Sequence, residues 1–229
     1  MSEQETHPQT MEAKLVEMFT AKEFYSLWTA AQAILLHHNF ELSAQIIFDE
    51  ACRMTGATSG YVALLSEDGA ENEILFLDSG GLPCTVDPNL PMPIRGLRAE
   101  AYHSGKTVCE NDFMSSQWVD FMPPGHVALT NVMFSPLNIE GKTVGIMGLA
   151  NKPDDFTEED ATLATAFGEI AAIALKNSRL IDQLNGSEKK LKELNEILAN
   201  QEKLLIDMKL EINNLCRQLG REAAYPEEL

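Results

Sequence analysis

Cys84 and His126 stand out in this sequence by their chemistry and by their surroundings. Cys84 lies in a segment with four prolines, GGLPCTVDPNLPMPIRG (80–96), and His126 follows Pro123-Pro124-Gly125. A thiol is a nucleophile and an imidazole is a metal ligand. Proline removes backbone freedom and amide donors, so both segments are expected to be ordered, irregular loops of the kind that often carries function. From the residues alone, Cys84 is equally well a packing residue, and His126 a surface residue that makes hydrogen bonds.

No pattern in the sequence predicts catalysis. Cys52, Cys109 and Cys216 are widely scattered, with no CxxC pair and no zinc-ligand spacing. The sequence contains no GxSxG, no phosphate-binding loop and no HExxH. We therefore expect a protein that is not an enzyme, with reduced thiols that mostly pack as small apolar groups.

The charge of the chain restricts its partners. The net charge is −18, and residues 178–229 carry ten acidic and eight basic side chains, which leaves −16 for residues 1–177. Such an acidic domain is repelled by phosphate backbones and anionic bilayers, so neither nucleic acid nor a membrane surface is an expected partner. The first residues, MSEQETHPQT, lack the order of a signal peptide, and no long apolar run occurs. These features predict a cytoplasmic protein.

The elements that position the two loops follow from periodicity and turn residues. Helical patterns run from Met11 to about His38 and from Leu42 to Met54, and Thr157 is a natural N-cap for a long final helix. Short apolar segments between turn residues predict strands, and one short helix lies among them. The strands are Ser59–Ser66, Glu73–Asp78, Lys106–Glu110, Asn131–Ile139 and Thr143–Ala150, and the short helix is Leu97–Ser104. This order predicts an α+β fold, an antiparallel sheet with helices on one side.

The final helix continues into a heptad pattern. One register holds for more than six repeats, which is typical of a coiled coil, and polar residues in the seam favour a parallel dimer. The a and d positions are Ile173, Asn177, Leu180, Leu184, Ser187, Leu191, Leu194, Leu198, Gln201, Leu205, Met208, Ile212, Leu215 and Leu219. Asn185–Ser187 weakens helix propensity, and apolar g positions at Ile197 and Leu204 also suit an antiparallel hairpin, a bundle or a helix that folds back on its own domain.

The segment from Gly145 to Leu184, GIMGLANKPDDFTEEDATLATAFGEIAAIALKNSRLIDQL, resembles the closing segment of GAF domains. The resemblance covers about residues 30–184 and implies a small-molecule or cofactor sensor that signals through coiled-coil helices. Some members bind cyclic nucleotides and carry an Asn-Lys…Phe…Asp-Glu signature. Asn151, Lys152, Phe156 and Asp160 match it, but Ala161 replaces the final Glu. We expect Lys152 to pair with Asp160 as part of the scaffold, with no ligand required.

The middle of the domain is similar to GAF domains of archaeal and bacterial redox-sensing kinases, a group with heme-binding members. In that group heme is attached through a single cysteine, with a histidine on the iron, and the matching positions here are Cys84 and His126. Arg95 and Arg98 can meet the propionates, or can balance the acidic surface. Trp118 belongs to a set of apolar residues that can line a porphyrin cavity or form ordinary core. That set is Phe76, Met92, Ile94, Phe113, Met114, Trp118, Phe121 and Met122.

The resemblance and the residues together predict a non-enzymatic sensor that binds heme or another small ligand and signals as a coiled-coil homodimer. A histidine kinase or a regulator is the partner that the resemblance implies. Two alternatives stay open: a GAF domain that binds another molecule or serves mainly in dimerisation, and a free methionine sulfoxide reductase. The expected organisation is a flexible N-terminus (1–10), a helical segment (11–38), the GAF domain (39–178), the coiled coil (179–220) and a flexible tail (221–229).

Overall fold

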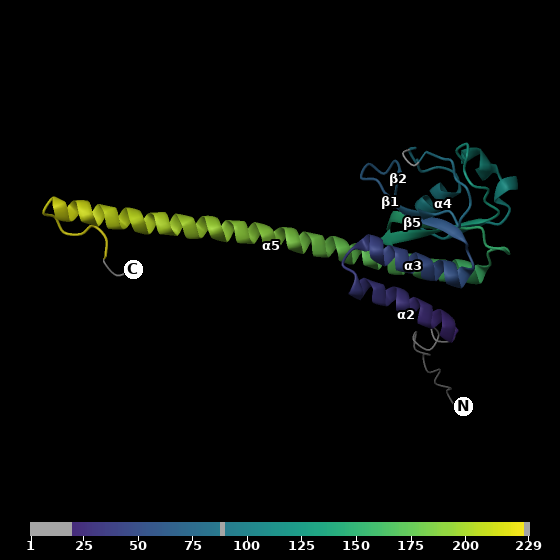
Figure 1. Ribbon diagram of the computed structural model, residues 1–229, viewed down its shortest axis with the longest axis horizontal. Coiled ribbons are helices and arrows are strands. Elements are labelled where there is room, and N and C mark those ends of the chain that lie inside the picture. Colours follow the sequence, from purple (N-terminus) through teal and green to yellow (C-terminus); the bar gives the residue numbers. More distant parts are fainter. Residues whose placement is uncertain (1–19, 88–89, 227–229) are drawn as a thin grey trace, which may run out of the picture. The chain divides into compact units, whose positions relative to one another are not determined.

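The computed structural model describes residues 20–87 and 90–226, which form two units divided between Ser178 and Arg179. The first unit is built on a five-stranded antiparallel sheet with the order β2-β1-β5-β4-β3 (Figure 1). The strands are β1 (Ser59–Leu65), β2 (Asn72–Asp78), β3 (Val108–Glu110), β4 (Val132–Ile139) and β5 (Lys142–Ala150). The predicted α+β fold is therefore confirmed.

Local sequence explains the central hairpin of the sheet. Strands β4 and β5 are joined by Glu140 and Gly141, which both have positive φ, and Ile139 pairs with Lys142 across the turn. Two consecutive residues with positive φ form the tight turn whose twist matches that of the flanking strands. The hairpin lies at the centre of the sheet, and β1 joins it along β5.

Helices α2 (Ala21–Leu36) and α3 (Phe40–Thr55) and the first turns of α5 (Glu158–Gln218) share one core with one face of the sheet. Ile47, Met147 and Phe167 are fully buried there. The N-cap prediction for α5 is confirmed: the Asp160 amide donates to Thr157 Oγ1 at 3.2 Å, and the Thr157 amide donates to Asp160 Oδ2 at 2.8 Å. These reciprocal bonds satisfy amides that the first helical turn leaves unpaired.

The opposite face of the sheet carries α4 (Leu97–Ser104) and two short 3₁₀ segments, Phe113–Ser115 and Gln117–Phe121. The prediction of helices on one side only was therefore wrong. Burial explains the difference, since residues 132–137 of β4 are all buried, so both faces of this strand need a cover. Ala63, Ile146 and Leu97 form part of the second core that results.

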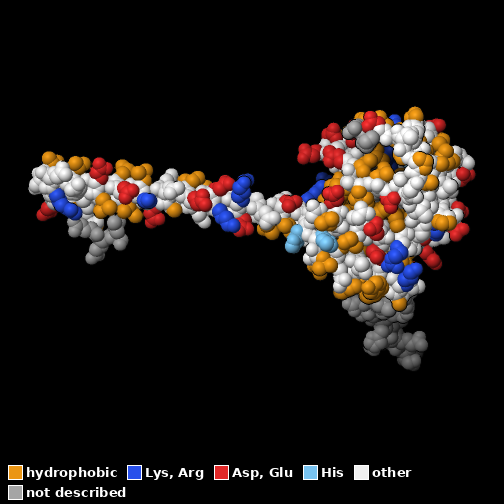
Figure 2. Space-filling model, viewed as in Figure 1, with side chains coloured by type: hydrophobic (Ala, Val, Ile, Leu, Met, Phe, Trp, Pro, Cys, Tyr) orange, Lys and Arg blue, Asp and Glu red, His pale blue; other side chains and the backbone are white. Residues whose placement is uncertain are grey.

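Helix α5 extends over 61 residues and runs without interruption through Asn185–Ser187 into the second unit. Within that unit, apolar side chains reach the surface at intervals along the helix, among charged side chains of both signs (Figure 2). Gly220 ends the helix in the left-handed conformation, and the Asn213 amide group exchanges two hydrogen bonds with the backbone of Tyr225.

Parts of the predicted organisation fall outside the description. The flexible N-terminus at 1–10, the beginning of the helical segment 11–38 as far as residue 19, and positions 227–229 of the tail are not among the described residues. Across the described ranges, no helix is long and apolar enough to cross a membrane. The same ranges contain no group of three or more His, Cys, Asp or Glu side chains placed to hold a metal ion.

Candidate functional site

A cavity of about 650 Å³ lies over the α4 face of the sheet. Tyr61 on β1, Gly148 on β5 and Phe134 on β4 lie side by side in the strand register and form part of its floor. The two rings approach to 6.2 Å between centroids, because Gly148 places no side chain between them. A Cβ atom at Gly148 would lie 3.0 Å from carbon atoms of both rings. This glycine therefore sets the shape of the floor.

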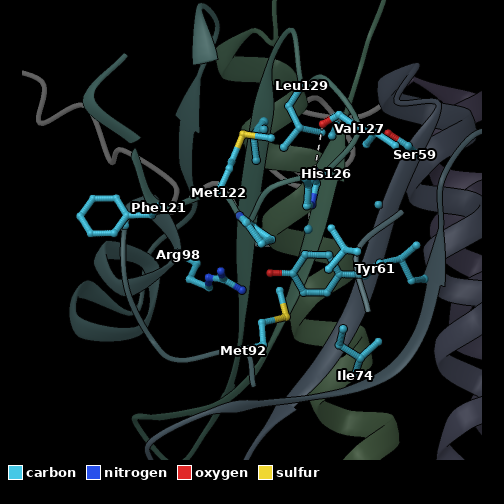
Figure 3. Close-up of a pocket in the computed structure, with 18 of the residues that line it drawn as sticks. Ser59, Tyr61, Ile74, Met92, Arg98, Phe121, Met122, His126, Val127 and Leu129 are labelled. Carbon is cyan, nitrogen blue, oxygen red and sulfur yellow. Dashed lines mark hydrogen bonds between the residues drawn. The ribbon is translucent and has the colours of Figure 1, made fainter. Parts of the chain in front are cut away.

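The five site residues expected from the sequence all line this one cavity, although they come from three separate segments. Figure 3 shows two of them, Arg98 and His126, at the cavity. Cys84 and Arg95 come from the loop after β2, Arg98 from α4, and Trp118 and His126 from the segment between β3 and β4. Most of the remaining lining is apolar. It includes Ile74, Leu77, Met92, Leu97, Phe113, Phe121, Met122, Val127, Leu129 and Val132.

Two contacts tie the loops together and bring Cys84 and His126 into the same wall. The Thr85 amide and hydroxyl both donate to the Gly125 carbonyl, at 3.0 and 3.3 Å. Gly125 has φ +84° and faces the Thr85 hydroxyl so closely that any Cβ atom would overlap it. Because Thr85 follows Cys84 and Gly125 precedes His126, this tether fixes the two residues together. The second contact is a 3.4 Å hydrogen bond from Arg95 to the Phe121 carbonyl.

The imidazole of His126 is held in one orientation. Its Nδ1 lies 2.9 Å from the carbonyl oxygen of Val127, as Figure 3 shows. A carbonyl only accepts hydrogen bonds, so Nδ1 carries the proton and, in the neutral ring, Nε2 carries a free lone pair. Metal-binding histidines are commonly oriented in this way by a backbone carbonyl. His126 is therefore equipped to act as a ligand through Nε2.

The cysteines differ in their surroundings. Cys84 is exposed at the cavity, whereas Cys52 on α3 and Cys109 on β3 are not among the lining residues. Burial, and then the charge of Asp49, raise the pKa of Cys52 to about 12. Cys109 keeps an exposed surface, but the protein atoms packed on its other side, and then the charge of Glu110, raise its pKa to about 11. Both groups are therefore neutral thiols near pH 7 and poor nucleophiles.

Arg95 and Arg98 occupy different environments. Arg95 is exposed, whereas Nη1 of Arg98 is buried and makes no hydrogen bond within the described structure. The hydroxyl of Tyr61 is also buried without a partner. Burial raises the pKa of Tyr61, and the nearby positive charge of Arg98 lowers it again in part. The two groups lie close together but are not placed for a hydrogen bond of ordinary geometry. Sequence reasoning missed Tyr61, because an aromatic residue in an apolar strand is typical of a core.

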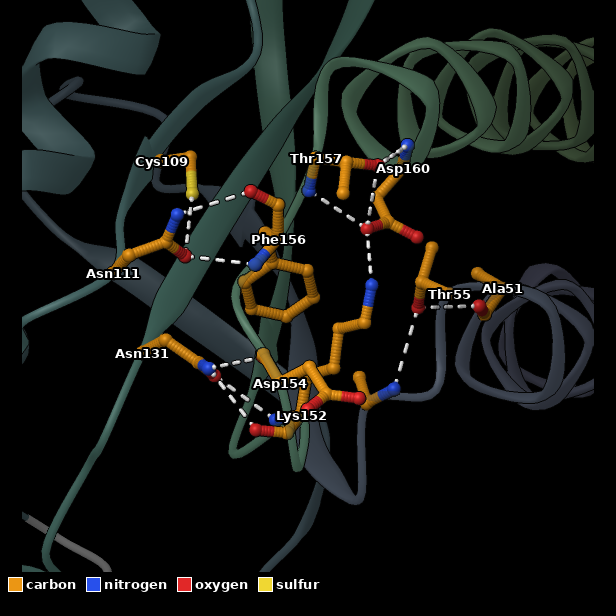
Figure 4. Close-up of polar contacts among 11 residues, drawn as sticks. Ala51, Thr55, Cys109, Asn111, Asn131, Lys152, Asp154, Phe156, Thr157 and Asp160 are labelled. Carbon is orange, nitrogen blue, oxygen red and sulfur yellow. Dashed lines mark hydrogen bonds and ion pairs between the residues drawn. The ribbon is translucent and has the colours of Figure 1, made fainter.

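Three of the four signature residues, Lys152, Phe156 and Asp160, belong to a polar network away from the cavity (Figure 4), whereas the Asn151 side chain accepts from Thr130 and donates to the cavity-lining Ser59 at 3.2 Å. The predicted ion pair between Lys152 and Asp160 is confirmed, and the Lys152 ammonium lies 5.8 Å from the centre of the Phe156 ring. The side chain of Asn131 bonds the backbone of Lys152 and Asp154. None of the residues in this network is among the cavity-lining residues. The network ties the end of β5 to the start of α5, as expected of a scaffold.

A five-stranded antiparallel sheet with helices α2, α3 and the start of α5 on one face and a cavity on the other is a GAF-like α+β architecture. Residues 38–176 match the GAF domain family, and the chain belongs to that family. The chain is also 23% identical over 187 residues to a methyl sulfide methyltransferase-associated sensor of Methanosarcina acetivorans. That match covers 79% of this chain and 17% of the relative, so the chain spans about a sixth of the length of that relative.

Solved structures agree on the fold. The GAF domain of a phosphoenolpyruvate-protein phosphotransferase from Coxiella burnetii superposes with a TM-score of 0.61 at 14% identity, covering 71% of this chain and 97% of that domain. Free methionine-R-sulfoxide reductase from Neisseria meningitidis, solved in complex with its substrate, gives 0.55 at 18% identity, covering 71% and 95%. At these identities the likeness shows the fold alone, and the fold occurs in both sensors and enzymes.

Proposed function

We propose that this chain is a non-enzymatic sensor module that binds heme in the cavity and transmits redox state or gas binding through a coiled-coil dimer. The observation that carries the proposal is the convergence of Cys84, Arg95, Arg98, Trp118 and His126 on one apolar cavity. Its volume of about 650 Å³ lies within the range of small-molecule and cofactor sites. The named relative, a sensor, supports the same class of function.

The residues present fit a heme group. His126 offers Nε2 to the iron, with its ring already oriented by the Val127 carbonyl. Cys84 is the residue that would hold the porphyrin covalently, because its thiol could add across a vinyl group, with a sulfur–carbon bond replacing the carbon–carbon π bond and the thiol proton passing to the other vinyl carbon. This addition needs no oxidant. When bound, heme supplies an iron that changes oxidation state and binds diatomic gases.

A second candidate is a different small ligand in the same cavity, with dimerisation as the main role of the module. The apolar lining and the two arginines suit many organic acids as well as heme. A cyclic nucleotide has less support, because three of the four residues that match the nucleotide-binding signature lie in the scaffold network, and none of the four is among the cavity-lining residues.

A sulfoxide reductase activity has the least support. That chemistry uses several thiols in one site, and among the described cavity residues Cys84 is the one thiol. Cys52 and Cys109 lie elsewhere and have raised pKa values. Turnover that consumes thiols, measured with thioredoxin and NADPH, would favour the enzyme.

The exposed leucines of the second unit support a sensor that passes on its signal as a dimer. In the second unit Leu191, Leu198 and Leu205 are more than half exposed in a single chain, at positions that a parallel partner helix would cover. We propose a homodimer through 179–220 that acts on a histidine kinase or a regulator in the cytoplasm. The acidity of the chain argues against direct contact with nucleic acid or a membrane surface.

The absorption spectrum tests the proposal. Protein from heme-supplied cells is expected to show a Soret band that survives acid–acetone extraction. Cys84→Ser should keep the band but lose its resistance to extraction, and His126→Ala should shift or abolish it. Cys109→Ser is the matched control, because its thiol lies outside the cavity, and it should behave as wild type. A chain that shows no Soret band after reconstitution with hemin refutes the heme proposal.

A further inference from the structure

Tyr61 and Arg98 place two unpaired donors in the wall of the cavity. The Tyr61 hydroxyl and Arg98 Nη1 are each shielded from solvent and lie near each other, so that Arg98 lowers the pKa that burial raises at Tyr61, but neither group makes a hydrogen bond of ordinary geometry to the described residues. A buried donor that is left unsatisfied destabilises the fold, and a charged donor does so more strongly. Two neighbouring donors in this state indicate an acceptor that the protein chain does not itself provide.

The two donors are held by a rigid frame. Tyr61 stands on β1, and its ring is packed against Phe134 across Gly148. Arg98 stands on α4, one turn before Tyr102, whose hydroxyl donates to Asn72 Oδ1 at 2.5 Å. Residues four apart lie on the same helix face, so this bond orients the face that carries Arg98. The backbone N–H of Asn72 donates to the Met92 carbonyl at 2.9 Å, which joins the frame to the loop after β2, while the side-chain Nδ2 of Asn72 is buried without a partner.

Charge selects the kind of acceptor. A neutral carbonyl would satisfy a hydrogen bond but would leave the guanidinium charge of Arg98 uncompensated in a largely apolar site. A carboxylate supplies two acceptor oxygens and one negative charge, and it matches guanidinium geometry. Figure 3 shows the Tyr61 hydroxyl and the Arg98 guanidinium pointing toward one another at the cavity, so an acceptor placed there would meet both groups.

We propose that Tyr61 and Arg98 form a carboxylate subsite that anchors the ligand of this sensor at the sheet end of the cavity. The inference rests on the cavity being the ligand site and extends it to a residue that the sequence did not indicate. Arg95, which is exposed and bonded to Phe121, is assigned to holding the loops rather than to this subsite. The carboxylate has two possible sources, a porphyrin propionate or a free organic acid.

The first experiment compares hemin with hemin dimethyl ester, in which both propionates are neutral. The full chain with Cys84→Ser keeps binding reversible, and affinity is measured by Soret titration. In this background hemin should bind more tightly than the ester by about tenfold or more, the scale of one hydrogen bond to a charged group. Adding Tyr61→Phe or Arg98→Met should reduce that preference to about twofold or less.

The second experiment uses benzoate and its neutral isostere benzamide on heme-free protein, read by thermal shift. A ligand that binds the folded state raises the melting temperature. Benzoate alone should raise it in wild type, and Tyr61→Phe should remove the shift. Tyr25→Phe is the control: Tyr25 is an exposed tyrosine on α2 outside the cavity lining, so this variant should keep the preference for a charged ligand.

The outcomes separate this inference from the proposed function. A preference for hemin over its ester identifies a propionate as the source, and a benzoate shift without that preference identifies a free acid. Failure of hemin to bind refutes heme sensing, and the benzoate arm then decides on the subsite alone. Equal binding of hemin and its ester, together with no benzoate-specific shift, overturns the subsite. If Tyr61 had only a structural role, Tyr61→Phe would instead lower the stability of the ligand-free protein.

Discussion

Gly148 shows how far the cavity depends on a single residue. Gly148→Ala would place a methyl group 3.0 Å from both the Tyr61 and Phe134 rings, which are fixed by the strands on either side. Overpacking of this kind should lower the free energy of unfolding by about 1–3 kcal/mol. Urea denaturation measures it. Gly186→Ala is a useful comparison, because a methyl group there meets nothing within 4 Å and should be neutral or stabilising. Equal effects of the two substitutions would contradict the packing argument.

The thiols of Cys52 and Cys109 predict an alkaline limit to stability. Their folded-state pKa values, about 12 and about 11, lie above the ordinary thiol value of 9.0. The unfolded chain therefore loses these protons first, so the contribution to stability is complete below about pH 9 and is lost as the pH rises toward 11 to 12. Urea midpoints should fall across this window. Cys52→Ala should flatten the fall, whereas an unchanged pH profile in that variant would assign the fall to other groups.

At the scale of elements, the tether between the two loops governs the site. Gly125→Ala would overlap the Thr85 hydroxyl and force apart the loops that carry Cys84 and His126. Gly81→Ala is the matched control, since Gly81 has a similarly positive φ of +76° but meets nothing within 4 Å. We expect both variants to lose some stability through backbone strain, but Gly125→Ala alone to lose hemin affinity. Soret titration distinguishes them, and equal affinities would show that the tether does not position the ligand site.

Comparing the observed elements with those predicted from the sequence shows which features local patterns determine. The short helix Leu97–Ser104 was predicted at its observed bounds, because glycines on both sides delimit it. Which face of the sheet it covers could not be predicted, since β4 is buried at six successive positions and shows no alternation. Cys84 and His126 could be selected from the sequence because they lie in proline-rich segments, and Arg98 because of its charge. Tyr61 escaped notice because the burial of its hydroxyl without a partner depends on long-range packing that no local pattern encodes.

The whole molecule should associate through its second unit. Leu198→Asp together with Leu205→Asp would place charges in the proposed seam, where both leucines are more than half exposed in the single chain. Sedimentation equilibrium should then give a monomer, whereas wild type gives a dimer. Because each chain carries −18, lowering the ionic strength should weaken the dimer. Leu210→Asp, at an exposed position outside the a and d register, is the control. A monomeric wild-type chain would refute the coil.

The sheet itself joins the cavity to the long helix. On β4, Phe134 lines the cavity, while its neighbour Ser135 donates to the Ala164 carbonyl of α5 at 2.8 Å. In the proposed sensor, a ligand that shifts this strand also shifts the association of two chains, and by linkage association changes ligand affinity by the same factor. The ligand concentration that half-saturates the sensor therefore depends on how much of the sensor is present. A cell that makes more of the sensor therefore changes the ligand concentration to which the sensor responds.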